Sequence, residues 1–452
     1  MKYKKLCLIT LGCPKNLVDS ETILALLGQE KYILTNTYRQ ADIIVINTCG
    51  FIKDAVDESI GVVKRHCRKK RKGQKIVVYG CLVNRYKDGF PSIKGVDMLV
   101  EGGSPPVLIN AIKTGFKKKF ISGDCFCVEK LPRLISTYPY AYLKVSDGCN
   151  NFCSYCLIPK IRGNLRSRSI EDIVKEAESL EKMGIKEVIL IAQDTGNYGR
   201  DIKGMCLLDK LLAQLCRYRF HWIRVMYMHP AHLTDSVLET IAVNKNICRY
   251  LDIPLQHIHP DILKKMNRPL MDYSKLIDRI RKAVPDIKLR TTFIVGFPGE
   301  KEEHFRMLVD FIKEKEFDRL GVFRYSREEG TPAFNLNGAL DEETKKEREK
   351  IVMEIQRKIS RKKLQKMMGK KVDVLIEEKS GNLFTGRTEF DAPEIDGTVY
   401  IKAKGILKPG DISMVYITST SDYDLYGEEV KTTEPSSKKH LTLKGKRARG
   451  GW

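Results

Sequence analysis

The chain has 452 residues, of which 42% are hydrophobic, and this is typical of a globular protein of two to four domains rather than a fibrous or disordered one. No apolar run approaches the ~18 residues that a membrane span needs, and the basic start precedes a run too short for a signal peptide, so we expect a cytoplasmic protein with no membrane partner. The net charge of +23 favours a polyanionic partner such as RNA or a ribosome, although a solvated basic surface would give the same charge.

Residues 1–115 predict a doubly wound α/β domain. Short apolar runs alternate with helical patterns there, as parallel strands joined by helices would require. The predicted strands are residues 6–11, 43–46 and 76–79. Each is soon followed by a cysteine, and these three form the first triad: Cys13, Cys49 and Cys81. Because the carboxyl ends of parallel strands line one crevice, we expect the three thiols to meet there. The alternative is that they are ordinary core cysteines.

A second group of cysteines, the loop triad, lies further along the chain. Residues 140–369 contain six strand-then-helix units, which predict a partial (βα)6 barrel, with a charged connecting helix at 341–366. Directly after the first predicted strand the spacing is C-x3-C-x2-C, at Cys149, Cys153 and Cys156. Three thiolates can hold three irons of a 4Fe-4S cube and leave the fourth iron open to a small molecule. A structural zinc site is the alternative, but no fourth ligand lies at a usual local spacing.

The thirteen cysteines favour metal binding or catalysis over disulfides, since no secretion signal precedes them. The first triad again offers three thiolates, so we expect it to hold a second 4Fe-4S cluster with an open iron. Residues 116–139 predict a linker between the two domains. Its Cys125 and Cys127 suggest no function.

The loop triad resembles the signature of radical S-adenosylmethionine (SAM) enzymes, in which such a cluster passes one electron to SAM. Sites in barrels of this kind lie at the carboxyl ends of the strands. Residues on that face are therefore candidate SAM contacts: Tyr155, Gln193, Asp194, Thr195, Gln256 and Gly296. We interpret His257 and His259 as pocket or loop residues rather than metal ligands.

Residues 370–430 alternate polar and apolar side chains between regularly spaced glycines, which predicts a small antiparallel β-barrel. This segment has seven basic and twelve acidic residues, whereas residues 64–75 and the tail at 431–452 are strongly basic. The tail has no hydrophobic pattern, so we expect it to be disordered.

The three predicted domains, in this order, resemble the radical SAM methylthiotransferase family up to about residue 430, and the last of them resembles the TRAM fold. Four motifs are similar to its RimO branch, which modifies an aspartate of a small-subunit ribosomal protein. They are LGCPKNLVDSE at 11–21, PKIRGNLRSR at 159–168, IAQDT at 191–195 and DAPEIDG at 391–397. The tRNA-modifying MiaB branch usually has Gln and Met in place of Pro14 and Lys15. The basic tail and the high net charge depart from the family pattern.

The resemblance implies a reaction. One SAM is cleaved reductively at the cluster of the loop triad, and a hydrogen is taken from an unactivated carbon of the substrate. A methyl-sulfur unit held at the cluster of the first triad is then delivered there, and a second SAM supplies the methyl. The enzyme would need an external one-electron reductant and a sulfur source.

Two other functions compete with this one: methylthiolation of a tRNA adenosine, and a non-catalytic iron–sulfur protein that binds RNA or senses redox state. Two open irons argue against a sensor. The net acidic 370–430 barrel opposes phosphate and suits a basic ribosomal protein. We therefore expect Asp391, Glu394 and Asp396 to help dock the substrate protein.

Overall fold

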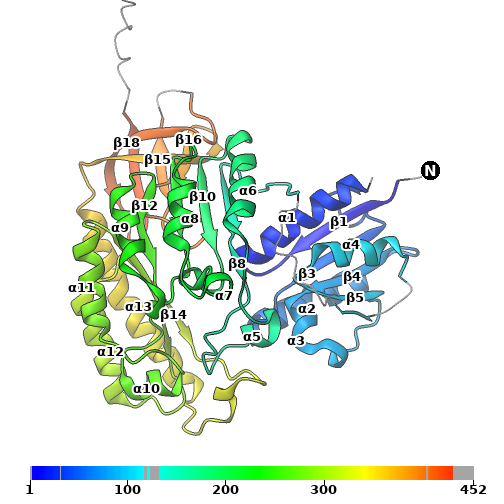
Figure 1. Cartoon of the computed structure of the whole chain (residues 1–452), viewed down its shortest axis with the longest axis horizontal. Helices are drawn as coiled ribbons and strands as arrows, with labels where there is room; N and C mark the ends of the chain where they lie inside the picture. The colour runs from blue at the N-terminus through cyan, green and yellow to red at the C-terminus, as the bar shows by residue number, and fades with distance from the viewer. Residues whose placement is uncertain (1–2, 31, 117–119, 123–131, 404–405, 431–452) are drawn as a thin grey trace, which may run out of the picture.

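The structure is a computed structural model that describes residues 3–30, 32–116, 120–122, 132–403 and 406–430. The Cys125 and Cys127 pair and the basic tail lie outside the described residues. Figure 1 shows three units: an N-terminal unit in blue to cyan, a central unit in green to yellow, and a C-terminal barrel in orange at one end of the central strands.

The N-terminal unit is a six-stranded parallel sheet, in agreement with the predicted α/β fold, with the strand order β2-β1-β3-β4-β5-β6. Its strands are β1 (Lys5–Thr10), β2 (Ile33–Leu34), β3 (Ile43–Thr48), β4 (Lys75–Gly80), β5 (Met98–Glu101) and β6 (Phe120–Ile121). Its helices are α1 (Pro14–Gln29), α2 (Lys53–Arg68), α3 (Cys81–Tyr86) and α4 (Pro105–Lys113), with a 3-10 turn at Lys87–Gly89.

The buried strands of this sheet are apolar on both sides because helices cover both faces. Along β3, Ile43 and Val45 pack with α1 and α4, whereas Ile44 and Ile46 pack with α2 and α3. Since β1, β3 and β4 are neighbours in the sheet, the strand ends that precede the three predicted cysteines also lie side by side.

The central unit is an open, six-stranded parallel sheet with the order β14-β13-β12-β11-β10-β7, as expected for a partial barrel. Its strands are β7 (Tyr140–Lys144), β10 (Glu187–Ile191), β11 (Trp222–Val225), β12 (Ile247–Asp252), β13 (Lys288–Val295) and β14 (Arg319–Arg324). A short antiparallel ladder joins β8 (Ser146–Asp147) to β9 (Arg166–Ser167).

Helices of the central unit follow its strands, and most of them contribute to one apolar cluster against the sheet. They are α5 (Ile158–Arg162), α6 (Ile170–Lys182), α7 (Arg200–Lys203), α8 (Leu208–Leu215), α9 (Asp235–Val243), α10 (Pro260–Lys265), α11 (Tyr273–Ala283), α12 (Glu302–Lys315) and α13 (Glu342–Gln365). Three 3-10 turns lie at Thr195–Asn197, Pro230–His232 and Pro332–Asn335. Within the described residues, none of the helices is long and apolar enough to cross a membrane.

The C-terminal unit is a closed five-stranded barrel with the order β15-β16-β17-β19-β18. Its strands are β15 (Lys371–Ser380), β16 (Leu383–Arg387), β17 (Val399–Lys402), β18 (Ile412–Thr420) and β19 (Leu425–Glu429). The predicted antiparallel pairing holds except between β17 and β19, which run parallel.

The loop after β16 packs against the central strands, where its Ala392 shares a buried cluster with Tyr142, Ile189 and Tyr250. Asp391 is buried there and forms an ion pair with Arg319, the first residue of β14. Asp396 accepts a hydrogen bond of 2.7 Å from the hydroxyl of Tyr250 in β12. The expectation that Asp391 and Asp396 dock a ribosomal protein is therefore wrong, because both carboxylates already hold two units of the chain together.

Glu394, the third acidic residue of that expectation, is exposed at the loop's tip and accepts a hydrogen bond from the Tyr140 hydroxyl at 3.2 Å. The same junction also contains a fully buried charge triad. Glu187 of β10 pairs with Arg224 at 2.6 Å and with Arg387 of the C-terminal barrel at 2.7 Å. The acidic motif of the third unit thus mainly attaches it to the central unit.

Candidate active site

The three cysteines of the first triad lie together at the carboxyl edge of the N-terminal sheet. Gly12 makes this close approach possible, because an added Cβ would lie 2.8 Å from the Cβ of Cys49 and 3.2 Å from its Sγ. Burial raises the pKa of Cys49, and the neighbouring Cys13 raises it further. Burial also raises the pKa of Cys81 to about 12, with Arg162 acting in the opposite direction and Cys13 and Cys49 adding to the rise. The three thiols therefore feel one another's charge, as ligands of one centre would.

The loop triad follows β8 in a tightly anchored loop. Gly148 has a φ of +77°, and a Cβ there would lie only 2.0 Å from the carbonyl oxygen of Asn164, so the loop requires glycine at this turn. The backbone amide of Cys149 donates to the carbonyl of Gly163 at 3.1 Å. On the other side of the loop, the amide of Ser154 donates to the carbonyl of Met266 at 2.9 Å. These contacts hold the loop from two directions.

The thiols of this loop also influence one another. Burial raises the pKa of Cys149 to about 11 and that of Cys156 to about 12, and the neighbouring thiols add to both shifts. Arg268 points a guanidinium nitrogen at the Sγ of Cys153, at 3.9 Å. A cation beside buried sulfur favours the thiolate, which is the form that binds metal.

Neither triad is gathered as tightly as a single metal ion would require. Sulfur ligands of one tetrahedral zinc ion lie about 3.8 Å apart, given a Zn–S bond of ~2.3 Å. In the described part of the chain, the groups of three metal-binding side chains whose ligand atoms lie within 4.8 Å contain no cysteine. These groups are Asp194, His229 and His232, and His259, Asp261 and His304. Wider thiol spacing suits a four-iron cube, in which each thiolate binds a different iron.

Arg162 connects the first triad to the central unit. Its side chain is buried, and its Nε donates to the Sγ of Cys81 at 3.2 Å. Its Nη1 donates to Asp19 at 3.1 Å and to Asp147 at 3.2 Å, and its Nη2 donates to Asn16 at 2.5 Å. Asn16 and Asp19 belong to α1, whereas Asp147 precedes the loop triad by two residues. One guanidinium therefore contacts both halves of the site.

Lys144 completes this buried network by donating to Asp19 at 2.6 Å and approaching Asp147 at 3.4 Å. Burial works to raise the pKa of Asp147, but Arg162 and Lys144 outweigh it and hold that pKa well below its ordinary value. Two carboxylates thus face two cations, so the charges in the buried network balance.

Lys15 places a further cation between the N-terminal and central units. Its ammonium donates to the carbonyl of Ala192, just after β10, at 3.1 Å and lies 3.8 Å from the centre of the Tyr227 ring. Burial lowers the pKa of Lys15, and the nearby Cys13 and Asp147 oppose that shift. The positive charge is therefore held between the first triad and the carboxyl ends of the central strands.

Two of the predicted SAM contacts offer buried atoms that lack a partner. Gln193 donates through its amide nitrogen to Asp147 at 2.8 Å, but its Oε1 is buried and accepts no hydrogen bond from the described residues. The same is true of Oε1 of Gln256. An unpaired buried oxygen costs about 1–3 kcal/mol, so a bound ligand with N–H or O–H groups would relieve both. Gly296 has a φ of +73°, and an added Cβ would lie 2.3 Å from Cγ of Lys345, which explains the glycine by packing.

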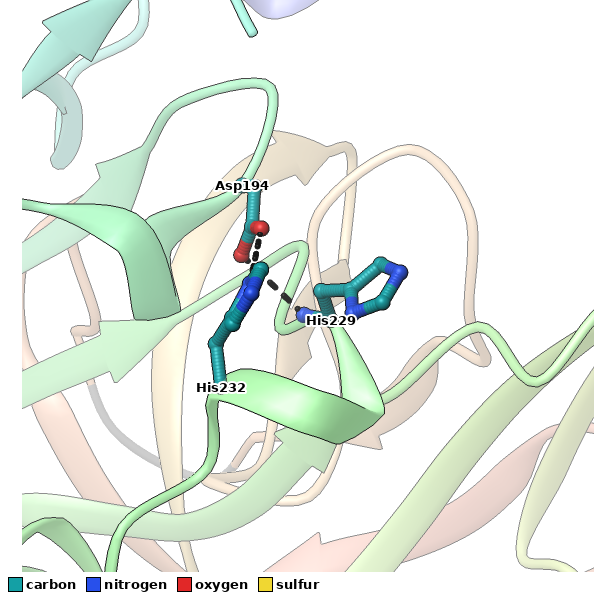
Figure 2. Close-up of side chains that lie close together, drawn as sticks. All are labelled: Asp194, His229 and His232. Atoms are coloured by element: carbon teal, nitrogen blue, oxygen red, sulfur yellow. Dashed lines mark hydrogen bonds and ion pairs between the residues drawn. The ribbon is translucent and has the colours of Figure 1, made fainter. Parts of the chain in front are cut away.

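Asp194 organises the site through four hydrogen bonds, of which those to His229 and His232 are drawn in Figure 2. Its Oδ2 accepts from Asn151 of the cysteine loop at 2.8 Å and from His232 at 2.7 Å. Its Oδ1 accepts from the backbone amides of Gly196 at 3.1 Å and His229 at 3.2 Å. Burial works to raise the pKa of Asp194, but His232 outweighs it and the net shift is downward. Both oxygens are engaged, so this carboxylate ties the cysteine loop to the turns after β10 and β11.

The remaining two predicted contacts differ in character. Thr195 is fully buried, and its hydroxyl donates to the carbonyl of Met226 at 2.8 Å, which is a structural contact. Tyr155 lies inside the cysteine loop and packs edge-on against Phe297, with 6.5 Å between the ring centres. Burial raises the pKa of Tyr155 well above its ordinary value, so the phenol is neutral and presents an aromatic surface beside the thiols.

Comparison with known proteins places this site in a family. The model of the radical SAM superfamily matches residues 143–312, that of "Uncharacterized protein family UPF0004" matches residues 5–101, and the TRAM domain model matches residues 368–430. The ribosomal protein uS12 methylthiotransferase RimO of Clostridioides difficile (strain 630) is 45% identical over 436 residues, which cover 94% of this chain and 98% of the relative. The RimO protein of Geobacter sulfurreducens is 43% identical over 440 residues, with 94% and 98% covered. The chain belongs to the RimO family.

Solved structures of other radical SAM proteins resemble this RimO-family chain in fold. The radical SAM methyltransferase TsrM from Kitasatospora setae, with cobalamin and a [4Fe-4S] cluster bound, has a TM-score of 0.55 and 14% identity, covering 74% of this chain and 77% of TsrM. The cobalamin-dependent radical SAM enzyme OxsB has a TM-score of 0.50 and 13% identity, covering 78% of this chain and 56% of OxsB. At these identities the likeness concerns the fold alone.

Several residues of the site were not identified from the sequence. Arg162, Asp19 and Arg268 were not singled out, although the first two lie inside motifs typical of the RimO branch. The position of Arg162 and Asp19 within those motifs is the one available signal, because a charged residue on a helix is more often solvated. Their role depends on contacts between residues more than a hundred positions apart.

Proposed function

We propose that the chain is a radical SAM methylthiotransferase that inserts a methylthio group at an unactivated C–H of an aspartate in ribosomal protein uS12. The relatives that carry this name match nearly the whole chain, which supports the proposal. The observation that carries it is the pair of cysteine triads on two units, with Arg162 contacting the first triad and the base of the loop triad. A protein that only bound RNA or sensed redox state would not need two such centres facing one buried network.

We propose that each triad holds one 4Fe-4S cluster through three thiolates: Cys13, Cys49 and Cys81 in the first, and Cys149, Cys153 and Cys156 in the second. The bound clusters would supply the electron for reductive SAM cleavage and the site for the sulfur to be transferred. The chain's own part is to keep the six sulfurs ionised. Arg162 beside Cys81 and Arg268 beside Cys153 offset the negative charge that ligation leaves in a buried place.

SAM would bind beside the loop triad. Gln193 and Gln256 each offer a buried amide oxygen for an ammonium or hydroxyl donor, which suits the amino and ribose groups of SAM. Tyr155 offers an aromatic face, and Gly296 can offer only its backbone, because Lys345 leaves no room for a side chain there. In this proposal Asp194 and Thr195 act indirectly, because their side chains hold the cysteine loop and the strand ends in place.

Lys15 would recognise the carboxylate of the substrate aspartate. Its ammonium is anchored on one carbonyl and one ring, and the hydrogen bond to Ala192 uses one of its three donors. A charge-assisted hydrogen bond to a carboxylate would fix the neighbouring carbon between the two triads. We also propose that an external reductant and a sulfur source serve the enzyme, and that it works in the cytoplasm, where the ribosomal substrate is made.

Iron analysis and product analysis together test this function. After anaerobic reconstitution, we expect about eight irons per chain from two four-iron clusters, and about four after the loop triad is replaced by alanine. Loss of the loop triad should abolish deoxyadenosine formation, whereas loss of the first triad should preserve it and stop sulfur insertion. Mass spectrometry of uS12 and of digested tRNA identifies the substrate. Zinc in place of iron, or methylthioadenosine in tRNA with unmodified uS12, would reject the proposal.

A further inference from the structure

A basic groove lies at the end of α2, away from both triads. It is a surface hollow of about 700 Å³ formed by three segments: the end of α2 with the loop that follows it, the start of β4, and the loop before β5. Its seven cationic lining residues are Lys64, Arg68, Lys70, Arg71, Lys72, Lys75 and Lys94, and among the described residues no acidic one lines it. The floor includes Cys67 and Ile93, whose apolar contacts fix the shape.

Few of these charges are neutralised within the protein. Asp97, at the rim, pairs with Lys70 and with Lys75, at 2.5 Å and 3.0 Å. Arg71 donates to the backbone carbonyl of Ala41 at 2.8 Å and has no ion-pair partner in the described part of the chain. Within the described residues, one carboxylate beside the groove therefore faces seven cations that line it.

Four further cations of the groove are exposed and form no ion pair within 4.0 Å among the described residues. They are Lys64, Arg68, Lys72 and Lys94. Cations at the end of α2 are partly explained by the helix dipole, which favours positive charge at a helix C-terminus. That effect does not extend to Lys72 and Lys94, because neither lies on the helix. Exposed cations from three segments meet at this one hollow, and an anionic ligand explains this better than the helix dipole does.

We infer that this basic groove binds the phosphate backbone of RNA, and that the RNA is the ribosomal RNA next to the substrate protein. The inference rests on the proposed function, which brings the enzyme to a ribosomal protein. Phosphates repeat along a strand and are bound by lysine and arginine without regard to sequence, which suits an open hollow lined by several flexible cations.

The position of the groove permits binding and catalysis at the same time. The triad follows the carboxyl ends of β1, β3 and β4, whereas Lys72 and Lys75 lie at the amino end of β4. A strand of six residues spans about 20 Å, so RNA in the groove would lie that far from the thiols. The groove would hold the particle while the substrate loop reaches the other edge of the sheet.

Binding to a labelled single-stranded RNA oligonucleotide, measured against salt, tests this inference. The groove variant carries Lys64→Gln, Arg68→Gln, Lys72→Gln and Lys94→Gln. The control variant removes the same charge from exposed positions elsewhere: Lys210→Gln, Lys245→Gln, Arg306→Gln and Lys350→Gln. Four phosphate contacts contribute about −3 to the slope of log affinity against log salt. Between 50 and 200 mM salt, the affinity of the unmodified protein should therefore fall about 50-fold more than that of the groove variant.

Enzyme assays separate this inference from the proposed function. The groove variant should methylthiolate isolated uS12 at the normal rate, which also reports its correct folding, and should lose rate on assembled small ribosomal subunits. The inference would be overturned if the salt slope of RNA binding were unchanged in the groove variant, or if it fell equally in the control variant. Either result would be compatible with full activity on uS12, so the proposed function would stand. Stronger binding to anionic lipid vesicles than to RNA would also overturn it. If the unmodified protein and both variants fail to modify uS12 but RNA binding depends on the groove, the proposed function fails and the inference of RNA binding stands.

Discussion

Replacement of Arg162 by alanine should loosen the N-terminal unit from the central unit. The substitution removes four hydrogen bonds and leaves Asp19 and Asp147 with Lys144 as their remaining cation. Breaking a buried ion pair by removing one partner costs about 3–5 kcal/mol, since a charge stays buried without compensation. Against a typical total stability of about 5–15 kcal/mol, this is large enough to open the boundary between the units before the rest unfolds.

Hydrogen exchange measured by mass spectrometry reports this opening directly. A loss of about 3–5 kcal/mol corresponds to exchange that is faster by about 100-fold to 5,000-fold in peptides from α1 and from β7 to β8. Peptides from the C-terminal barrel should exchange as before, because their contacts to the central unit do not involve Arg162. Arg162→Lys keeps the charge but cannot reach all four partners. If it loses its contacts to Asn16 and Cys81, each worth about 1 kcal/mol, exchange should rise by about 30-fold.

The control for this experiment is Arg306→Ala, which removes an exposed arginine from α12. It should leave exchange unchanged everywhere outside its own helix. If Arg162→Ala changes exchange at the boundary by less than threefold, the buried network does not hold the two units together. Uniformly faster exchange, including the C-terminal barrel, would show that the network supports global stability instead.

Three further outcomes follow from the site. Gly12→Ala should displace Cys49 and lower iron from about eight toward about four per chain after reconstitution, while deoxyadenosine formation persists. Lys15→Met should raise KM for a uS12 peptide about 10-fold and leave SAM cleavage without substrate unchanged, and an unaltered KM would contradict its role in carboxylate binding. Burial lowers the pKa of His229 from its ordinary value of 6.5 to about 3. Below pH 6.5 the unfolded chain therefore takes up a proton at this residue, whereas the folded chain does not. The free energy of unfolding is unaffected by this residue above pH 6.5 and falls as the pH drops, by about 2 kcal/mol at pH 5. Urea unfolding of the His229→Asn variant should not show that loss.

The fold and the cysteine triads could be predicted because their signals are local. Strands such as β3 begin with a run of four apolar residues, and cysteines that follow three neighbouring parallel strands must converge at one edge of the sheet. The role of Asp391 could not be predicted in this way. An acidic turn rich in proline and glycine looks the same in sequence whether it faces solvent or Arg319, which is 72 positions away. Likewise, nothing near Asp194 in the sequence reveals that His232 and Asn151 occupy its carboxylate.

A short stretch of chain links the two triads directly. Cys156 is followed within two residues by α5, and Ile161 of that helix packs with Leu157 against Cys81. Arg162, the last residue of α5, then donates to the sulfur of Cys81. Cys156 of the loop triad is thus linked to Cys81 of the first triad by six residues and one guanidinium. Because a five-residue helix has little freedom to bend, α5 can fix how far apart the two centres lie even while more distant contacts between the units exchange.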